Sequence, residues 1–101
     1  MTGKVAVIGL GRMGAAMARR IHGAGAELIL WNRDQKKSEA ISMETGAAVA
    51  QTAAEAASRS EFVLTSLADG AAVSSVYLGP DGIVEGIGSG SIAIDTSTID
   101  P

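Results

Sequence analysis

The feature that most constrains the fold is a glycine-rich turn between two segments of different periodicity. Residues 5–8, Val-Ala-Val-Ile, form a continuous apolar run of the kind found in a strand buried on both faces. The run ends at Gly9-Leu-Gly-Arg-Met-Gly14, and from residue 12 to residue 24 the apolar side chains recur at helical spacing. A G-x-G-x-x-G turn that leads from a strand into a helix is typical of a dinucleotide-binding unit.

Each glycine of this turn has its own expected role. Gly9 permits the sharp exit from the strand, Gly11 lets a pyrophosphate approach the backbone, and Gly14 allows the helix to pack closely on the strand. The amides and the positive dipole end of the helix would then face the phosphates. Cofactor contacts are therefore predicted along the whole turn, at Gly9, Leu10, Gly11, Arg12, Met13 and Gly14. The alternatives are a glycine-rich turn without a ligand and, for Arg12, a solvated side chain.

Strand and helix patterns continue to alternate along the rest of the chain. Further strands are predicted at 28–31, 47–50, 62–65 and 91–94, helices at 35–44, 53–58 and 71–78, and a turn at 79–82. Such alternation implies a parallel sheet with right-handed crossovers. The expected fold class is α/β, a Rossmann-type doubly wound and mostly parallel sheet. We expect residues 1–101 to form one dinucleotide-binding domain, cut from a longer enzyme.

Composition limits the classes of partner and site. Eight basic and eleven acidic residues give a net charge of −3 without any basic run, so nucleic acid is not an expected partner. No apolar stretch is long enough for a membrane span or a signal-peptide core. The lack of cysteine is compatible with the reducing cytoplasm, where we expect this protein. The chain has no cysteine and one histidine, His22, which is expected at the surface. A metal site is not expected.

The residues after the second predicted strand favour NADP over NAD. In NAD-binding domains of this kind an acidic residue at this place binds the ribose hydroxyls, whereas this chain has Asn32 and Arg33. Asn32 can hydrogen-bond a ribose, and Arg33 can bind a 2′-phosphate through two hydrogen bonds. Lys36 and Lys37 add positive charge, and Asp34 is expected to cap the following helix. We therefore predict that NADPH is preferred to NADH; the alternative for Arg33 is a surface charge.

Three segments together resemble the β-hydroxyacid dehydrogenase family: the turn at 9–14, Trp31-Asn-Arg33 and Asp95-Thr-Ser-Thr-Ile-Asp-Pro101. The family includes 3-hydroxyisobutyrate dehydrogenase, the tartronate semialdehyde and glyoxylate/succinic semialdehyde reductases and, more distantly, 6-phosphogluconate dehydrogenase. The resemblance covers essentially the whole chain. It implies the NADP-binding domain of a reductase that transfers hydride from the nicotinamide to a small semialdehyde or 2-oxo acid.

The resemblance also implies where substrate meets cofactor. Ser97 and Thr98 match the family segment that lies beside the nicotinamide and helps to bind a substrate carboxylate, and Thr98 is also expected to contact the cofactor. Ser66, Leu67 and Ala68 match the stretch that runs past the cofactor, although relatives usually carry Leu-Pro where this chain has Leu-Ala. The family's general-acid lysine and its all-helical, dimer-building domain have no counterpart here. We therefore assign no catalytic residue, expect these residues alone to be inactive, and expect a homo-oligomer for the full-length protein.

Two other interpretations remain open. An imine reductase has a similar N-terminal domain that also favours NADPH, although its segment after the fifth strand usually differs from residues 97–101. A non-catalytic NADP-binding module, such as a redox-sensing or chromatin-associated domain, can be built on the same fold, and fold alone does not decide between them.

Overall fold

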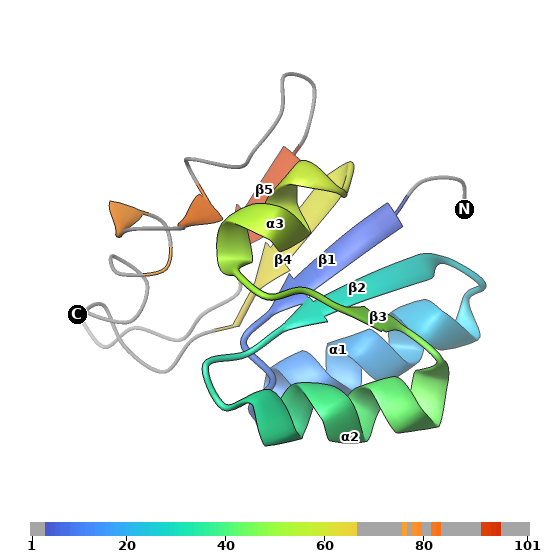
Figure 1. The fold of residues 1–101 in the computed structure, drawn as a ribbon. Coiled ribbons are helices and arrows are strands. Elements are labelled where there is room, and N and C mark those ends of the chain that lie inside the picture. Colours follow the sequence, from blue (N-terminus) through green and yellow to red (C-terminus); the bar gives the residue numbers. More distant parts are fainter. Residues whose placement is uncertain (1–3, 67–75, 77, 80–81, 84–91, 96–101) are drawn as a thin grey trace.

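A computed structural model describes residues 4–66, 76, 78–79, 82–83 and 92–95 of the chain. Within them, five parallel strands form one sheet in the order β3-β2-β1-β4-β5 (Figure 1). The strands are β1 (Lys4–Ile8), β2 (Glu27–Trp31), β3 (Ala48–Val49), β4 (Phe62–Thr65) and β5 (Ile92–Asp95), and the helices are α1 (Arg12–Gly23), α2 (Gln35–Thr45) and α3 (Ala53–Ser58). This strand order, with β1 at the centre, confirms the predicted Rossmann-type α/β fold.

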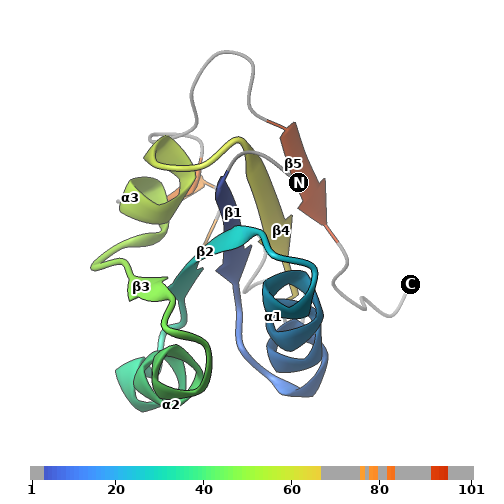
Figure 2. The ribbon, with the colours of Figure 1, turned by 90° about the vertical axis from the view of Figure 1, so that its right-hand side faces the viewer.

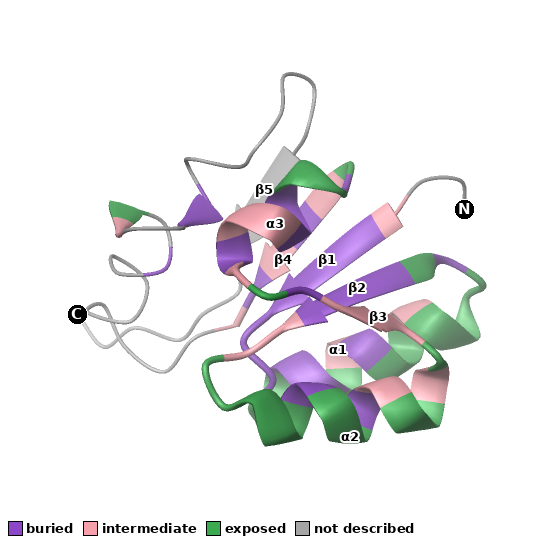
Figure 3. Cartoon of the chain, viewed as in Figure 1, coloured by how far each residue is buried: buried purple, intermediate pink, exposed green. Residues whose placement is uncertain are grey.

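Helices cover both faces of the sheet, as a doubly wound fold requires. Figure 2 shows α1 and α2 on one face and α3 on the other. Successive residues of β1 point to opposite faces, so Val5 and Val7 join the cluster under α1 and α2, while Ala6 and Ile8 join the cluster under α3. Figure 3 shows that β1 is buried along most of its length. Because both faces are covered, residues 5–8 of β1 are apolar without interruption rather than at alternate positions.

The end of α1 is set by its local sequence. Gly25 has a φ of 90°, and its N–H donates to the His22 carbonyl at 3.0 Å. The next amide, that of Ala26, reaches back to the Ile21 carbonyl at 3.3 Å. These two bonds form a Schellman motif, which ends the helix and turns the chain into β2.

The other element boundaries agree with the predicted ones or differ from them by one residue, as in β5, which is predicted at 91–94 and runs from Ile92 to Asp95. α2 runs one residue further than predicted, to Thr45, and β2 begins one residue earlier, at Glu27. The strand predicted at 47–50 is reduced to Ala48–Val49, because only these two residues pair with β2. The bounds of α3 and β4 agree with the prediction.

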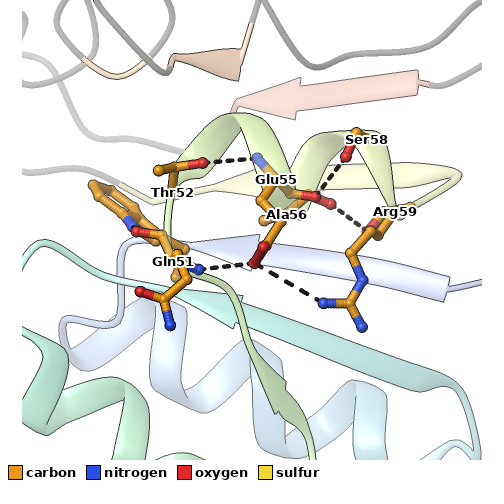
Figure 4. A network of polar contacts seen from close by, with 8 residues as sticks. Gln51, Thr52, Glu55, Ala56, Ser58 and Arg59 are labelled. Carbon is orange, nitrogen blue, oxygen red and sulfur yellow. Dashed lines mark hydrogen bonds and ion pairs between the residues drawn. The ribbon is translucent and has the colours of Figure 1, made fainter.

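A polar network holds the start of α3 (Figure 4). The Thr52 hydroxyl accepts a hydrogen bond from the Glu55 amide at 3.0 Å, and the Glu55 carboxylate accepts one from the Gln51 amide at 2.9 Å. Arg59 lies 4.0 Å from the same carboxylate. The Trp31 indole N–H donates to the Gln51 carbonyl at 3.3 Å, which ties the end of β2 to this network.

Most of the helix predicted at 71–78 lies outside the described residues, although Val76 and Leu78 are helical. In the predicted turn at 79–82, the Gly82 amide donates to the Gly79 carbonyl at 3.0 Å. No helix in the described part of the chain is long and apolar enough to cross a membrane.

Candidate functional site

The glycine-rich turn lies where β1 leads into α1, at the carboxyl edge of the sheet. Gly9 has a φ of 92°, a conformation that favours glycine, and its amide donates to the Trp31 carbonyl at 3.0 Å. A Cβ on Gly14 would overlap the Gly9 carbonyl oxygen and lie 2.9 Å from the carbonyl carbon. Gly11 is exposed, and a Cβ there would meet no atom within 4 Å. Gly14 is thus required for packing, whereas the backbone at Gly11 is open to a ligand.

The start of α1 differs from that of the other two helices in the described residues. The side chains of Asp34 and Thr52 cap α2 and α3, whereas the N-cap of α1 is Gly11, which has no side chain to offer. The first hydrogen bond of α1 runs from the Ala15 amide to the Gly11 carbonyl at 2.9 Å. The amides of residues 12–14 precede it and find no acceptor among the described residues. Together with the helix dipole, these amides can bind an anion.

Asn32 joins this turn to the loop between β2 and α2. Its Oδ1 accepts a hydrogen bond from the Leu10 amide at 2.8 Å, and its Nδ2 donates to the Asp34 carbonyl at 3.1 Å. The amide predicted to bind a ribose therefore already holds two backbone groups. The Asp34 carboxylate accepts a hydrogen bond from the Lys36 amide at 3.0 Å, which confirms its predicted role as the cap of α2.

Basic side chains lie on the turn and on the loop and helix that follow β2. Arg33 is exposed and forms no ion pair with any described residue. Lys37 lies on the first turn of α2 and lines a groove of about 330 Å³ together with Leu10, Gly11 and Arg12. The structure thus brings Lys37 to the glycine-rich turn, although Lys37 follows the last residue of that turn, Gly14, by 23 positions in the sequence. Positive charge beside unpaired amides suits a ligand that carries phosphates.

An ion pair between α1 and α2 was missed by the sequence analysis. The Arg19 side chain, which also lines the groove, donates from Nε and Nη2 to the Glu44 carboxylate at 2.7 and 3.1 Å. This hydrogen bonding and the charge of the partner lower the pKa of Glu44 and raise the pKa of Arg19. The two residues are 25 positions apart, so no periodicity within one helix indicates the pair. Arg19 is paired with Glu44. The groove's other cations, Arg12 and Lys37, are therefore the ones available to a ligand.

Ser66 lies at the same edge of the sheet. Its amide donates to the Ile8 carbonyl at 2.9 Å, and its Cβ would be 3.5 Å from a Cβ on Gly14. β5 pairs with β4 and ends at Asp95, also at this edge. The remaining predicted site residues, Leu67, Ala68, Ser97 and Thr98, lie outside the described residues.

A second hollow, of about 360 Å³, lies at the opposite edge of the sheet. Its lining includes Lys4, His22, Glu27 and Thr45, but no predicted cofactor residue. Lys4 is 3.9 Å from Glu27, and His22 is exposed, as expected. In the described ranges, no cluster of three or more His, Asp or Glu side chains could hold a metal ion. The carboxyl edge, with its open amides and basic side chains, is therefore the stronger candidate site.

Comparison with known proteins agrees with this geometry. Residues 4–101 match the family described as the NAD binding domain of 6-phosphogluconate dehydrogenase. The uncharacterized oxidoreductase YfjR of Bacillus subtilis is 46% identical over 96 residues, which cover 95% of this chain and 33% of that protein. The chain thus spans about a third of the length of this curated relative.

Two solved structures have the same fold over nearly the whole chain. The 3-hydroxyisobutyrate dehydrogenase of Mycobacterium tuberculosis is 30% identical with a TM-score of 0.86, over 98% of this chain and 33% of that chain. The imine reductase of Myxococcus stipitatus, in complex with NADP+, is 28% identical with a TM-score of 0.82, over 93% of this chain and 32% of that chain. The chain therefore belongs to the family of the NAD binding domain of 6-phosphogluconate dehydrogenase, the NAD(P)-binding part of oxidoreductases related to β-hydroxyacid dehydrogenases and imine reductases.

Proposed function

We propose that the chain is the NADPH-binding domain of a reductase that transfers hydride to a small carboxylate-bearing semialdehyde or 2-oxo acid. The observation that carries this proposal is the uncapped start of α1, with Lys37 in the adjoining groove. Exposed Arg33 follows Asn32, whose side chain bonds to the turn at Leu10. The nicotinamide supplies the hydride when it is bound, and the protein supplies placement.

The pyrophosphate is assigned to the glycine-rich turn. The open backbone at Gly11 leaves room for a phosphate oxygen, and the amides of residues 12–14 can donate to it. The exposed side chain of Arg12, which lines the adjacent groove, adds a positive charge on the same side.

The preference for NADPH is assigned to the loop after β2. Arg33 offers a planar fork of donors to a 2′-phosphate, and Lys37 adds a second charge from α2. The acidic residue that would bind the ribose hydroxyls of NADH is replaced by Asn32. Asp34, whose charge would oppose a phosphate, has one carboxylate oxygen committed to the Lys36 amide.

The substrate is assigned from the resemblance at Ser97 and Thr98 and from the dehydrogenase among the solved relatives. Carbonyl reduction also needs a proton as the hydride arrives, and a placed acid commonly contributes about 10²–10⁴ in rate. Lys37 and Lys36 lie on the side assigned to the adenosine, and Lys4 lies at the opposite edge of the sheet. We propose that the proton donor belongs to a part of the protein outside these residues.

An imine reductase is the second candidate, because a structure of that class with NADP+ superimposes on 93% of the chain. The two candidates share the cofactor site and differ in the electrophile. Assays of the whole protein with small semialdehydes, 2-oxo acids and cyclic imines, followed by absorbance of the reduced nicotinamide, separate them.

The cofactor proposal is tested by calorimetric titration of NADPH and NADH. A charge-assisted hydrogen bond contributes roughly 1.5–3 kcal/mol, which corresponds to a preference for NADPH of about ten- to a hundredfold. Arg33→Ala should largely erase that preference. Arg59→Ala, which removes an exposed arginine at the end of α3, should leave it unchanged. Equal binding of the two cofactors by the unmutated protein would contradict the proposal.

A further inference from the structure

The Asn32 side chain connects two parts of the backbone that belong to different halves of the proposed cofactor site. One is the glycine-rich turn, reached through the Leu10 amide at 2.8 Å, and the other is the loop that carries Arg33, reached through the Asp34 carbonyl at 3.1 Å. Both partners are backbone groups, so the bonds fix the path of the chain on either side. The two partners also fix the orientation of the carboxamide, because an amide N–H needs an acceptor and a carbonyl needs a donor.

Relative position matters because one ligand must reach both halves. NADPH carries its pyrophosphate and its 2′-phosphate on one adenosine unit, so binding at one half presents the ligand to the other half at a high effective concentration. That advantage is kept only when the two halves are held at the spacing of the ligand. Thr52 and Ser42 also bond to the backbone through their side chains, but their partners lie within one helix or its adjoining loop.

We propose that Asn32 is a positioning residue that sets the spacing between the pyrophosphate turn and the 2′-phosphate loop. This inference rests on the proposed function, since it assumes that NADPH occupies these two halves. It differs from the direct role predicted from the sequence, in which the Asn32 amide binds the ribose. In the structure, the Oδ1 atom and one Nδ2 hydrogen are already used on the protein itself.

The test compares two ligands that share the ribose but differ in reach. NADPH spans both halves of the site, whereas adenosine 2′-monophosphate reaches only the loop that carries Arg33. Asn32→Ala should lower the affinity for NADPH by roughly tenfold or more, because the spacing of the two halves is no longer held. The same change should alter the affinity for adenosine 2′-monophosphate by less than about threefold, because this ligand reaches only one half. Calorimetry measures the first affinity and ligand-observed NMR the second.

Two further variants keep the result clear. Asn32→Gln retains the carboxamide on a side chain one methylene longer, which cannot span the same two partners, so it should weaken NADPH as Asn32→Ala does. Ser42→Ala is the matched control: it removes a 2.6 Å bond from a side chain to the backbone, at the other end of α2. It should leave the binding of both ligands unchanged. Circular dichroism establishes that each variant is folded.

The outcomes separate the inference from the proposed function. An equal loss for the two ligands in Asn32→Ala would show a direct ribose contact and overturn the positioning role. An unchanged affinity for NADPH in both Asn32 variants would also overturn it, while the effect of Arg33→Ala would still support the proposed function. If the unmutated protein binds no NADPH, the proposed function itself fails.

Discussion

Replacing Gly14 with alanine tests the contact between α1 and β1. The added Cβ would overlap the Gly9 carbonyl oxygen and lie 2.9 Å from the carbonyl carbon. Gly9 cannot withdraw easily, because it already has a φ of 92° and its amide is bonded to the Trp31 carbonyl. Overpacking a buried position costs about 1–3 kcal/mol of stability. We expect a cost near the upper value here, because the added Cβ can be accommodated only if backbone atoms move. Since alanine is favoured over glycine in a helix by about 1 kcal/mol, we expect a net loss of about 2 kcal/mol.

The assay is urea unfolding, followed by circular dichroism and by the fluorescence of Trp31, the only tryptophan of the chain. With a slope of about 2 kcal/mol per molar urea, the expected loss lowers the midpoint by about 1 M. Gly23→Ala is the matched control: it lies in the same helix, where a Cβ would meet no atom within 4 Å. It should leave stability unchanged or raise it by up to about 1 kcal/mol. A midpoint for Gly14→Ala at or above that of the unmutated protein would refute the argument.

Four other predictions concern the cofactor site, the packing and charge pairing of α2, and the activity of residues 1–101 alone. Gly11→Val should abolish NADPH binding while the domain stays folded, because a Cβ at this position meets no protein atom but occupies the assigned phosphate position. Calorimetry measures the binding and circular dichroism the folding, and normal binding by the folded variant would contradict the prediction. Ser38→Ala should raise the free energy of unfolding by about 1–2 kcal/mol, since the fully buried Ser38 hydroxyl has no hydrogen-bond partner among the described residues; equal or lower stability in urea would count against this. Glu44→Gln should be less stable than the unmutated protein at pH 7, and this difference in stability should vanish as the pH falls through about 4 and below, because protonation removes the stabilisation that the lowered pKa of Glu44 reflects. Thermal melts across this pH range measure the difference, and a difference that stays constant would refute the prediction. A chain limited to residues 1–101 should bind NADPH but show no turnover of small carbonyl substrates near ordinary rates of about 1–10³ per second; such turnover would place the proton donor within these residues.

Elements that depend on neighbouring residues were predicted well from the sequence. The apolar run at 5–8, the glycines after it and the alanine-rich segment at 53–58 each act through local geometry, so their patterns indicated a strand, a turn and a helix in the right places. β3 is shorter than predicted, because only Ala48 and Val49 come into register with β2, and this register depends on two separate segments of the chain. The role of Asp34 as a cap was also predictable, since a cap and its amide lie two residues apart.

Contacts between distant segments could not be predicted in the same way. Asn32 was identified as a site residue, but its bonds to Leu10 and Asp34 depend on how the ends of β1 and β2 lie beside each other. The pair between Arg19 and Glu44 depends on the angle between two helices, and each residue alone resembles an ordinary surface charge. Such contacts follow from the assembled sheet and have no counterpart in periodicity.

The central place of β1 has a consequence for how the chain folds during synthesis. β1 pairs with β2, which follows after one helix, and also with β4, where Val5 lies opposite Phe62. A nascent chain that has emerged only as far as Ala50 contains β1, β2 and β3, but one edge of β1 still lacks its partner. Residues 5–8 of β1 are apolar on both faces of the sheet, and an unpaired strand of this kind can pair with strands of other chains. We therefore expect the first half of the domain to aggregate when it is produced alone, and to recover a native sheet when residues 51–101 are supplied with it.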